Sequence, residues 1–350
     1  MIRSAIIGYG GMGTWHHDSI TEKVPGIQVV GAYDVRPEAL EKAASKGLHT
    51  YQTLEELLAD TSLDLVTVAT PNNFHKDLVI RCLESGKNVV CEKPVAMNAA
   101  ELTEMIAASE RTGRLFSVHQ NRRWDKDYAI IKKLVQENTL GKPYFIESRV
   151  QGSSGGMHGW RGHKINGGGM LYDWGVHLLD QLMDMIDSPV VSVTAQLQSL
   201  FSDEIDDNVK LLLQFENGVS ALCTMETNCF IPLPRWHMCC EQGTVVVESW
   251  SAQGEIVQLA EGGKMEWTDE IVYTEAGPTR TMAPRPVNTT KHSPLPEVHT
   301  DWSDYYNNIV AVLDNRAELI VKPAQVLRVM RVIDLAFESS RQGVGLSCHI

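Results

Sequence analysis

A glutamate, a lysine and a proline end an apolar run at Glu92-Lys93-Pro94, and they are the first candidates for chemistry in the chain. The run before them, residues 87–91, is predicted to be a buried strand of a parallel sheet. Ligands bind at the carboxyl ends of such strands, and a lysine is almost never buried without a partner. Lys93 is therefore predicted to point at a ligand, with Glu92 positioning its ammonium group by pairing with it. The tripeptide alone leaves open a surface lysine before a turn proline.

A second candidate pair is Asp173 and His177, whose spacing of four places both side chains on one face of a helix. Asp180 can lie on the same stripe. An unperturbed imidazole titrates near pH 6.5, so His177 is the expected general base for an alcohol proton. Asp173 would orient His177 or bind a neighbouring hydroxyl, and Lys93 would stabilise negative charge on the reacting oxygen. Two alternatives stay open: Lys93 as the base, and a buried capping pair without a catalytic role.

The spacing Gly8-x-Gly10-x-x-Gly13 follows a predicted strand at residues 2–7 and opens a predicted helix. The first glycine allows a tight turn, the second lets the backbone approach a pyrophosphate, and the third lets helix and strand pack closely. A phosphate would then contact free N–H groups at a helix N-terminus. The motif in this context predicts a dinucleotide site.

An aspartate, Asp34, ends the next predicted strand, residues 27–33, and lies 21 positions after Gly13. This is close to the spacing of a carboxylate that holds ribose hydroxyls. It favours NAD, because the carboxylate would repel the 2′-phosphate of NADP. Arg36 keeps NADP as the less favoured alternative, since an arginine just beyond the acid can hold a phosphate.

A flexible stretch at residues 152–163 carries Trp160, Arg161 and two histidines among its glycines. Linkers rarely contain such side chains, so a sugar-binding or lid loop is predicted, with Trp160 and Trp124 as stacking planes. The alternative is a surface loop with incidental aromatic residues.

Strands and helices alternate up to residue 119, which predicts an α/β, doubly wound parallel sheet. Beyond it, predicted strands dominate an α+β region with an open, mostly antiparallel sheet and helices on one face. We expect a dinucleotide-binding Rossmann domain at 1–121 and a substrate-binding and oligomerisation domain at 122–350, closed by a helix at about 324–340. The uncovered sheet face predicts a homodimer or homotetramer. The Pro- and Thr-rich residues 278–296 are predicted to form a loop.

Composition narrows the function classes. The chain has 350 residues and a net charge of −13, which disfavours general binding to nucleic acid or an anionic membrane. No apolar run reaches the roughly 20 residues that span a bilayer, so we expect neither a membrane span nor a signal peptide. The seven cysteines form no CxxC pair, so reduced thiols, no metal site and a cytoplasmic location are predicted.

Four motifs occur together and in order: Gly8-x-Gly10-x-x-Gly13, Thr70-Pro71-Asn72 with His75, Glu92-Lys93-Pro94, and Gly169-x-x-x-Asp173-x-Gly175-x-His177. Across essentially the whole chain this combination resembles the glucose–fructose oxidoreductase / inositol dehydrogenase / MocA family. The resemblance implies a Rossmann domain and a C-terminal α/β domain whose open sheet serves oligomerisation. It also implies Lys93, Asp173 and His177 as the catalytic set.

The candidate residues fall into two overlapping groups. The cofactor group is Gly8, Gly10, Gly11, Met12, Gly13, Asp34, Arg36, Thr70, Pro71, Asn72, His75, Glu92 and Lys93. The substrate group is Lys93, Asn121, Arg122, Trp160, Arg161, Asp173 and His177.

The expected activity is NAD(P)-dependent hydride transfer between nicotinamide and a secondary alcohol of a sugar, glycoside or inositol, an expectation that rests on the resemblance. Two alternatives are an NAD-dependent glycosidase acting through transient sugar oxidation and a catalytically silent NAD-binding regulator.

Overall fold

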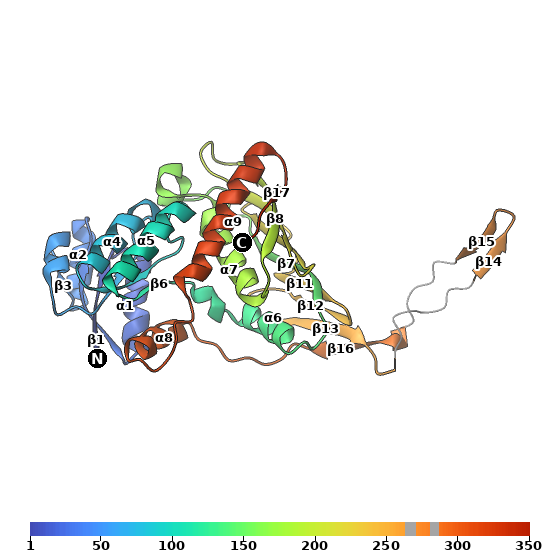
Figure 1. Cartoon of the computed structure of the whole chain (residues 1–350), viewed down its shortest axis with the longest axis horizontal. Helices are drawn as coiled ribbons and strands as arrows, with labels where there is room; N and C mark the ends of the chain where they lie inside the picture. The colour runs from blue at the N-terminus through green and yellow to red at the C-terminus, as the bar shows by residue number, and fades with distance from the viewer. Residues whose placement is uncertain (263–270, 281–286) are drawn as a thin grey trace.

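The computed structural model describes residues 1–262, 271–280 and 287–350. The N-terminal part forms a six-stranded parallel sheet in the order β3-β2-β1-β4-β5-β6 (Figure 1). This order confirms the predicted doubly wound sheet. Its strands are β1 (Ile2–Ile7), β2 (Ile27–Tyr33), β3 (His49–Thr50), β4 (Leu65–Val68), β5 (Asn88–Cys91) and β6 (Phe116–Val118), and its helices are α1 (Gly11–Lys23), α2 (Pro37–Ser45), α3 (Leu54–Ala59), α4 (His75–Glu84) and α5 (Ala99–Thr112).

Local sequence signals account for most of these boundaries. All four residues of β4 are buried, as expected for a central strand covered on both faces. Asn98 caps the start of α5 and Gly113, with φ of 64°, ends it. The elements α2 and β3 lack a clear sequence signal, because α2 buries only Ala39 and Ala43 and β3 has two residues.

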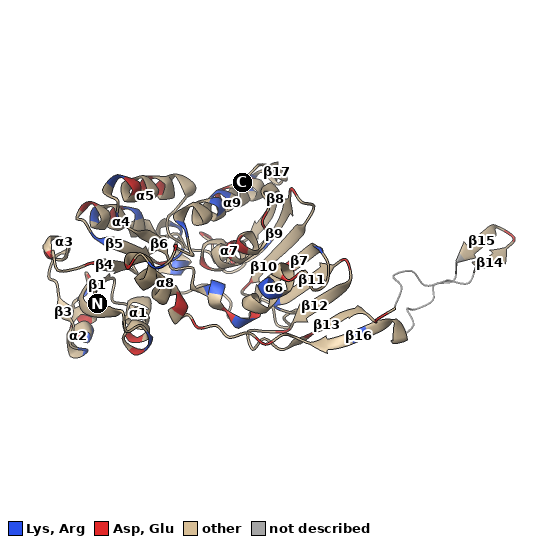
Figure 2. Ribbon diagram, turned by 60° about the horizontal axis from the view of Figure 1, so that its bottom comes forward, with Lys and Arg blue, Asp and Glu red and all other residues tan. Residues whose placement is uncertain are grey.

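The C-terminal part forms a nine-stranded sheet in the order β16-β13-β12-β11-β7-β10-β9-β8-β17, with helices along one face (Figure 2). Among the described strands of this second sheet, only β7 and β10 pair in parallel, which confirms the predicted mostly antiparallel sheet. The strands are β7 (Pro143–Gln151), β8 (Val190–Gln198), β9 (Asn208–Phe215), β10 (Ser220–Glu226), β11 (Trp236–Cys240), β12 (Gly243–Val247), β13 (Gly254–Leu259), β16 (Thr290–Pro294) and β17 (Leu346–Ser347), and the helices are α6 (Lys126–Gln136), α7 (Val176–Met185) and α9 (Pro323–Gln342).

The predicted loop at 278–296 is wrong in part. Residues 290–294 form the edge strand β16, which pairs with β13, and β15 (Gly277–Arg280) pairs with β14 (Ile271–Thr274) in a separate hairpin. An edge strand is held by backbone hydrogen bonds on one side only, so Thr-Lys-His-Ser-Pro needs no apolar alternation to form one. Residues 281–286 of that loop lie outside the described residues.

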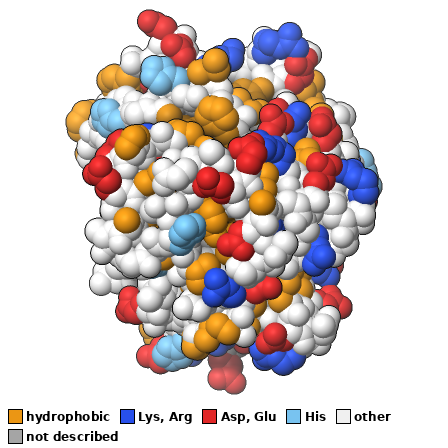
Figure 3. All heavy atoms as spheres, turned by 90° about the vertical axis from the view of Figure 1, so that its left-hand side faces the viewer, with side chains coloured by type: hydrophobic (Ala, Val, Ile, Leu, Met, Phe, Trp, Pro, Cys, Tyr) orange, Lys and Arg blue, Asp and Glu red, His pale blue; other side chains and the backbone are white. Residues whose placement is uncertain are grey.

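Charges of both signs are interspersed on the face of the N-terminal part that Figure 3 shows. A face with mixed charges lacks the continuous basic surface that binds a polyanion such as nucleic acid. In the described part of the chain, no helix combines the length and apolar character needed to cross a membrane.

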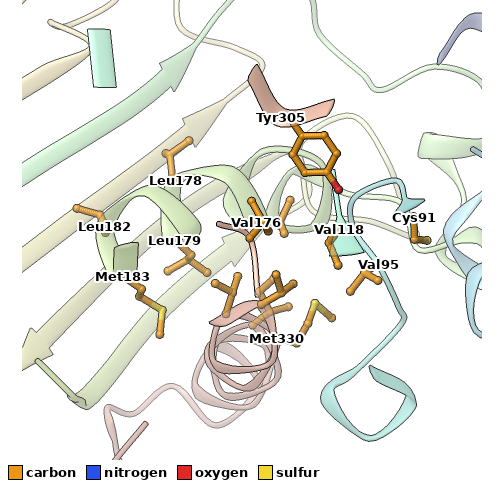
Figure 4. Packing of buried hydrophobic residues seen from close by; sticks show 14 of the residues in the cluster. Cys91, Val95, Val118, Val176, Leu178, Leu179, Leu182, Met183, Tyr305 and Met330 are labelled. Carbon is orange, nitrogen blue, oxygen red and sulfur yellow. The ribbon is translucent and has the colours of Figure 1, made fainter. Parts of the chain in front are cut away.

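One buried core joins the two sheets. Val95 and Val118 at the edge of the first sheet belong to the same cluster as Leu179 of α7 and Met330 of α9 (Figure 4). Helix α8 (Ser303–Leu313) also returns from the C-terminal end of the chain to pack against α1. The packing therefore fixes both sheets around the junction between them, while the division at residues 121 and 122 stays a prediction.

Candidate active site

The glycine-rich turn has the geometry of a dinucleotide cradle. A Cβ on Gly8, whose φ is 90°, would lie 2.5 Å from Ala69 O, and one on Gly13 would lie 2.0 Å from Gly8 O. A Cβ on Gly11 would meet nothing within 4 Å. Helix α1 starts there without a side-chain cap or an acidic residue in its first turn, so its N–H groups are free for a phosphate. Packing thus requires glycine at positions 8 and 13, and the open space beside Gly11 suits a pyrophosphate.

Asp34 lies at the end of β2, 7% exposed, and its carboxylate already holds this edge together. It accepts hydrogen bonds from the backbone N–H of Tyr9 at 2.8 Å and from Arg36 Nε at 3.1 Å and Nη2 at 3.2 Å. Burial alone would raise the pKa of Asp34, but the hydrogen bonds from Arg36 and Tyr9 lower it below its ordinary value. Arg36 therefore folds back onto the carboxylate and extends to within reach of Gly10.

The loop after β4 carries Thr70, Pro71 and Asn72 beside the same edge, and His75 begins the helix α4 that follows. Asn72 is buried and donates to Gly167 O at 2.8 Å, which ties this loop to the second part of the chain. His75 is fully buried, with its ring nitrogens 2.9 Å from Pro94 O and Thr70 O, and burial lowers its pKa. The ring of His75 therefore faces the interior and joins two loops. A direct role for it in cofactor binding stays a prediction.

Glu92 does not pair with the Lys93 ammonium, so that prediction is wrong. Its Oε1 lies 2.8 Å from both His16 Nε2 and His119 Nδ1, and its Oε2 accepts the backbone N–H of Lys93 at 3.1 Å. Burial would raise the pKa of Glu92, but the two imidazoles hold it well below its ordinary value. Tyr306 of α8 completes the cluster through His16 Nδ1 at 2.9 Å. Both histidines were missed, because a histidine on an apolar helix face or at a strand end gives no spacing signal.

His16, Glu92 and His119 are also the described residues whose ligand atoms come close enough together to hold a metal, within 4.8 Å of one another. The carboxylate already accepts hydrogen bonds from both imidazoles, so its buried oxygen is satisfied without an ion.

Lys93 and Asp173 meet, as the predicted site requires, across 80 residues of sequence. Lys93 lies two residues after the end of β5 and is joined to Pro94 by a cis bond. Its Nζ donates to Asp173 Oδ1 at 3.0 Å and to Asp173 O at 2.9 Å. Arg161 Nε donates to the same Oδ1 at 3.1 Å. Burial would raise the pKa of Asp173, but the two cations lower it below its ordinary value. The aspartate therefore stays ionised and holds two cationic side chains over the junction.

His177 is 3% exposed and is the second residue of α7, which starts at Val176. Its Nδ1 is a buried atom without a hydrogen-bond partner among the described residues. Burial lowers the pKa of His177 well below its ordinary value, and the nearby Lys93 and Arg122 lower it further. The imidazole is therefore neutral at physiological pH and has a free nitrogen.

The predicted orientation of His177 by Asp173 is absent from the structure. Residues 171–175 form a π-helical turn, which widens the spacing that an α-helix would give the pair. No hydrogen bond joins the two side chains in the described chain, since Asp173 is taken by Lys93 and Arg161. Asp180, which was expected on the same helix face, instead accepts two 2.7 Å hydrogen bonds from Arg123 and is a buried structural partner of that arginine.

Of the remaining substrate candidates, the two arginines lie at or beside the site and Trp160 lies farther out. Arg122 lies over the rings of Trp174 and Trp250, at 4.5 and 4.9 Å, and lines a cleft beside the site. Arg161 contacts Asp173 directly, while Trp160 contacts Arg161 at 4.4 Å and lies outside the described clefts. Asn121 opens the short turn that carries Arg122. The sequence pattern missed Trp174, although it lies between the two motif residues Asp173 and Gly175.

Family models match both parts of the chain. One described as "Oxidoreductase family, NAD-binding Rossmann fold" matches residues 2–120, and one described as "GFO/IDH/MocA C-terminal domain" matches residues 128–246. Among solved structures, the chain is similar to an NAD-binding protein from Listeria innocua, with 40% identity, a TM-score of 0.90 and 99% of each chain covered.

More distant relatives agree with this match. A scyllo-inositol 2-dehydrogenase (NADP(+)) of Bacillus subtilis is 26% identical over 97% of this chain and 94% of its own length. An aldose–aldose oxidoreductase from Caulobacter crescentus is 22% identical, with a TM-score of 0.80 and 99% of each chain covered, and shares the fold. The chain therefore belongs to the Gfo/Idh/MocA family of oxidoreductases, with an NAD-binding Rossmann fold in its N-terminal part.

Proposed function

We propose that this protein is an NAD(P)-dependent dehydrogenase that transfers a hydride between nicotinamide and a secondary alcohol of a sugar, glycoside or inositol. The contact between Lys93 Nζ and Asp173 Oδ1, at 3.0 Å, carries the proposal. It joins a cation at the carboxyl edge of the dinucleotide sheet to the segment that leads into the neutral His177. An ammonium donor and an imidazole acceptor are the two groups that alcohol oxidation needs.

The cofactor we propose is NAD, with NADP as the less favoured alternative. The free N–H groups of α1 would hold the pyrophosphate, and the Asp34 carboxylate would accept hydrogen bonds from ribose hydroxyls. The engagement of Arg36 with Asp34 supports NAD, because a 2′-phosphate would have to compete with the carboxylate for the guanidinium. A bound nicotinamide dinucleotide supplies the hydride acceptor.

The residues of the chain handle the proton and the developing charge. As the carbon–hydrogen bond breaks, the alcohol proton passes to His177, whose neutral imidazole has a nitrogen free to accept it. Lys93 donates to the same oxygen and stabilises negative charge on it until the carbonyl forms. Asp173 holds Lys93 in place and can accept a neighbouring hydroxyl. In the alternative assignment Lys93 is the base, and His177 then positions the hydroxyl.

The substrate class rests on relatives and on the polar groups at the site. The Bacillus relative is named for scyllo-inositol, and Asp173 and Arg161 offer a cyclic polyol both acceptor and donor groups. We also propose a cytoplasmic location, which the seven free thiols fit, and a homodimer or homotetramer formed through the open face of the second sheet.

The test is the ultraviolet absorbance of NADH during incubation with NAD and a panel of sugars and inositols, run beside an assay for glycoside cleavage. We expect net NADH from at least one polyol, with turnover lost in Lys93→Met and strongly reduced in His177→Ala. Retention of near wild-type turnover in both variants would contradict the residue assignment. Glycoside cleavage without net NADH would favour the glycosidase alternative, and neither activity would favour the regulator.

A further inference from the structure

An unusual share of the tryptophans lines one cleft beside the reaction site. The cleft has a volume of about 710 Å³ and lies between α1, the turn before α6 and the segment before α8. Five of the eight tryptophans of the chain line it: Trp15, Trp124, Trp174, Trp250 and Trp302. Tryptophans so concentrated in a cleft, rather than in the core, offer several apolar planes to a ligand.

These planes are held in fixed positions by stacking and hydrogen bonding. The ring of Trp250 contacts two guanidinium groups, with Arg122 at 4.9 Å and Arg235 at 4.5 Å from its centre. Its ring is 5.7 Å from that of Trp174. Trp302 is fixed by a 2.9 Å hydrogen bond from its Nε1 to Asp125 Oδ1. A ligand that stacks on such preorganised rings loses less affinity to ordering the protein.

The charges around the cleft are largely paired within the protein. Lys23 pairs with Asp301 at 2.7 Å, Arg122 pairs with Asp125 at 2.9 Å, and Arg235 pairs with Asp127 at 3.2 Å. Because these pairs cancel, the cleft has no strong preference for an anion or a cation. It suits a neutral ligand with apolar faces and hydroxyl edges.

The cleft adjoins the proposed reaction site through Trp174. Trp174 follows Asp173 directly, its ring is 6.0 Å from the ring of His177, and it lines both this cleft and the neighbouring one that contains Asp173 and Arg161. None of Gly8, Gly10 or Asp34 lines the tryptophan cleft, so it is not the dinucleotide groove. A ring in the cleft would therefore lie next to a ring that reacts beside His177.

We propose that the tryptophan cleft binds a second sugar ring, so that the preferred substrate is a neutral disaccharide or longer glycoside rather than a free monosaccharide or inositol. The inference rests on the proposed function, because one ring is placed at Lys93 and His177. The axial C–H groups of a pyranose form apolar faces that stack on indole rings, while its hydroxyl edges remain free for polar neighbours. The volume matches sites that enclose ligands larger than one ring.

The test compares matched single-ring and two-ring substrates, such as glucose with cellobiose and maltose, and galactose with lactose, using the NAD-loaded full chain. We expect the two-ring member of at least one pair to have a kcat/KM at least about tenfold higher, a difference of about 1.4 kcal/mol. Trp250→Ala should remove most of that advantage through KM and change the single-ring kcat/KM less than about twofold. Trp250→Phe, which keeps a plane, should restore part of it, and Tyr273→Ala, on the exposed hairpin, is the matched control.

Binding separates this inference from the catalytic proposal. Quenching of tryptophan fluorescence by each disaccharide, with NAD present, reports on the cleft whether or not NADH forms. Saturable quenching that Trp250→Ala and Trp302→Ala weaken about tenfold would support the second-ring site even without turnover. Turnover of single rings with no advantage for any two-ring partner, equal losses for both substrate sizes in Trp250→Ala, or no disaccharide binding at all would each overturn it.

Discussion

Replacing the buried carboxylate at position 92 tests how the edge of the dinucleotide sheet is built. Glu92 is 5% exposed and accepts from His16 at 2.8 Å, from His119 at 2.8 Å and from the backbone N–H of Lys93 at 3.1 Å. Glu92→Gln keeps the shape and removes the charge. If the carboxylate is a structural centre, the change should act mainly on stability; if it directs the Lys93 ammonium, it should act mainly on turnover.

The magnitude follows from the contacts. Hydrogen bonds to a charged group contribute about 1.5–3 kcal/mol each to stability, and a glutamine oxygen can still accept one of the three that Glu92 accepts. We therefore expect Glu92→Gln to lower the free energy of unfolding by about 3 kcal/mol at pH 7.5. Because the pKa of Glu92 is lowered in the folded protein, its contribution is fully present above the ordinary value of 4.5 and is lost as the pH falls below it. The difference in unfolding free energy between Glu92→Gln and wild type should therefore become smaller below pH 4.5.

The assay is urea unfolding followed by circular dichroism at several pH values, beside kcat at 25 °C. Glu55→Gln is the matched control, since Glu55 pairs with Arg81 at 2.7 Å on the exposed surface and should leave stability unchanged. A Glu92→Gln protein with unchanged unfolding and a large loss of kcat would refute the structural assignment and restore the pairing with Lys93.

Three further results are expected. Gly13→Ala should lower the free energy of unfolding in urea by about 3 kcal/mol, because its Cβ would lie 2.0 Å from Gly8 O. Gly11→Ala has open space around its Cβ, so it should leave stability intact and instead weaken NAD binding measured by calorimetry. Asp34→Ala should weaken NAD binding and raise the ratio of NADP to NAD affinity by freeing Arg36, and an unchanged ratio would count against that pairing. Burial lowers the pKa values of His75, His119 and His177, so the unfolded chain binds more protons than the folded chain below pH 6.5. The free energy of unfolding should therefore fall as the pH drops through 6.5, by up to about 1.4 kcal/mol per pH unit for each histidine. His177→Gln should make this dependence on pH less steep, and an unaltered dependence would contradict the burial of a neutral ring at position 177.

Periodicity and turn residues were sufficient to predict much of the fold. The predicted strands 2–7 and 27–33 agree with the structure because each is bounded by a glycine, and the closing helix expected at about 324–340 spans Pro323–Gln342. Strand β16 was missed because an edge strand can be polar on both faces. The return of α8 to the first sheet was also missed, since no local pattern records which distant surface a helix will cover.

The site was predictable only as far as its motifs reach. Lys93 and Asp173 meet because the end of a parallel strand and the start of a helix are places where polar side chains are exposed to a ligand. The partners of Glu92 and Asp180 depend on tertiary packing, and the π-helical turn at 171–175 changes a spacing that was read as α-helical. Nothing in the sequence indicates that five distant tryptophans share one cleft.

The most direct measurement of the central claim is single-turnover hydride transfer from a deuterated polyol to NAD in wild type, Lys93→Met and His177→Ala, followed across pH. We expect wild type to form NADH with a primary isotope effect and Lys93→Met to form none within the same time. His177→Ala should be slow but partly rescued by added imidazole, which can replace the missing base. Unimpaired NADH formation in either variant, or no hydride transfer from any polyol by a wild-type protein that binds NAD, would contradict the claim that these two groups act together on a sugar alcohol.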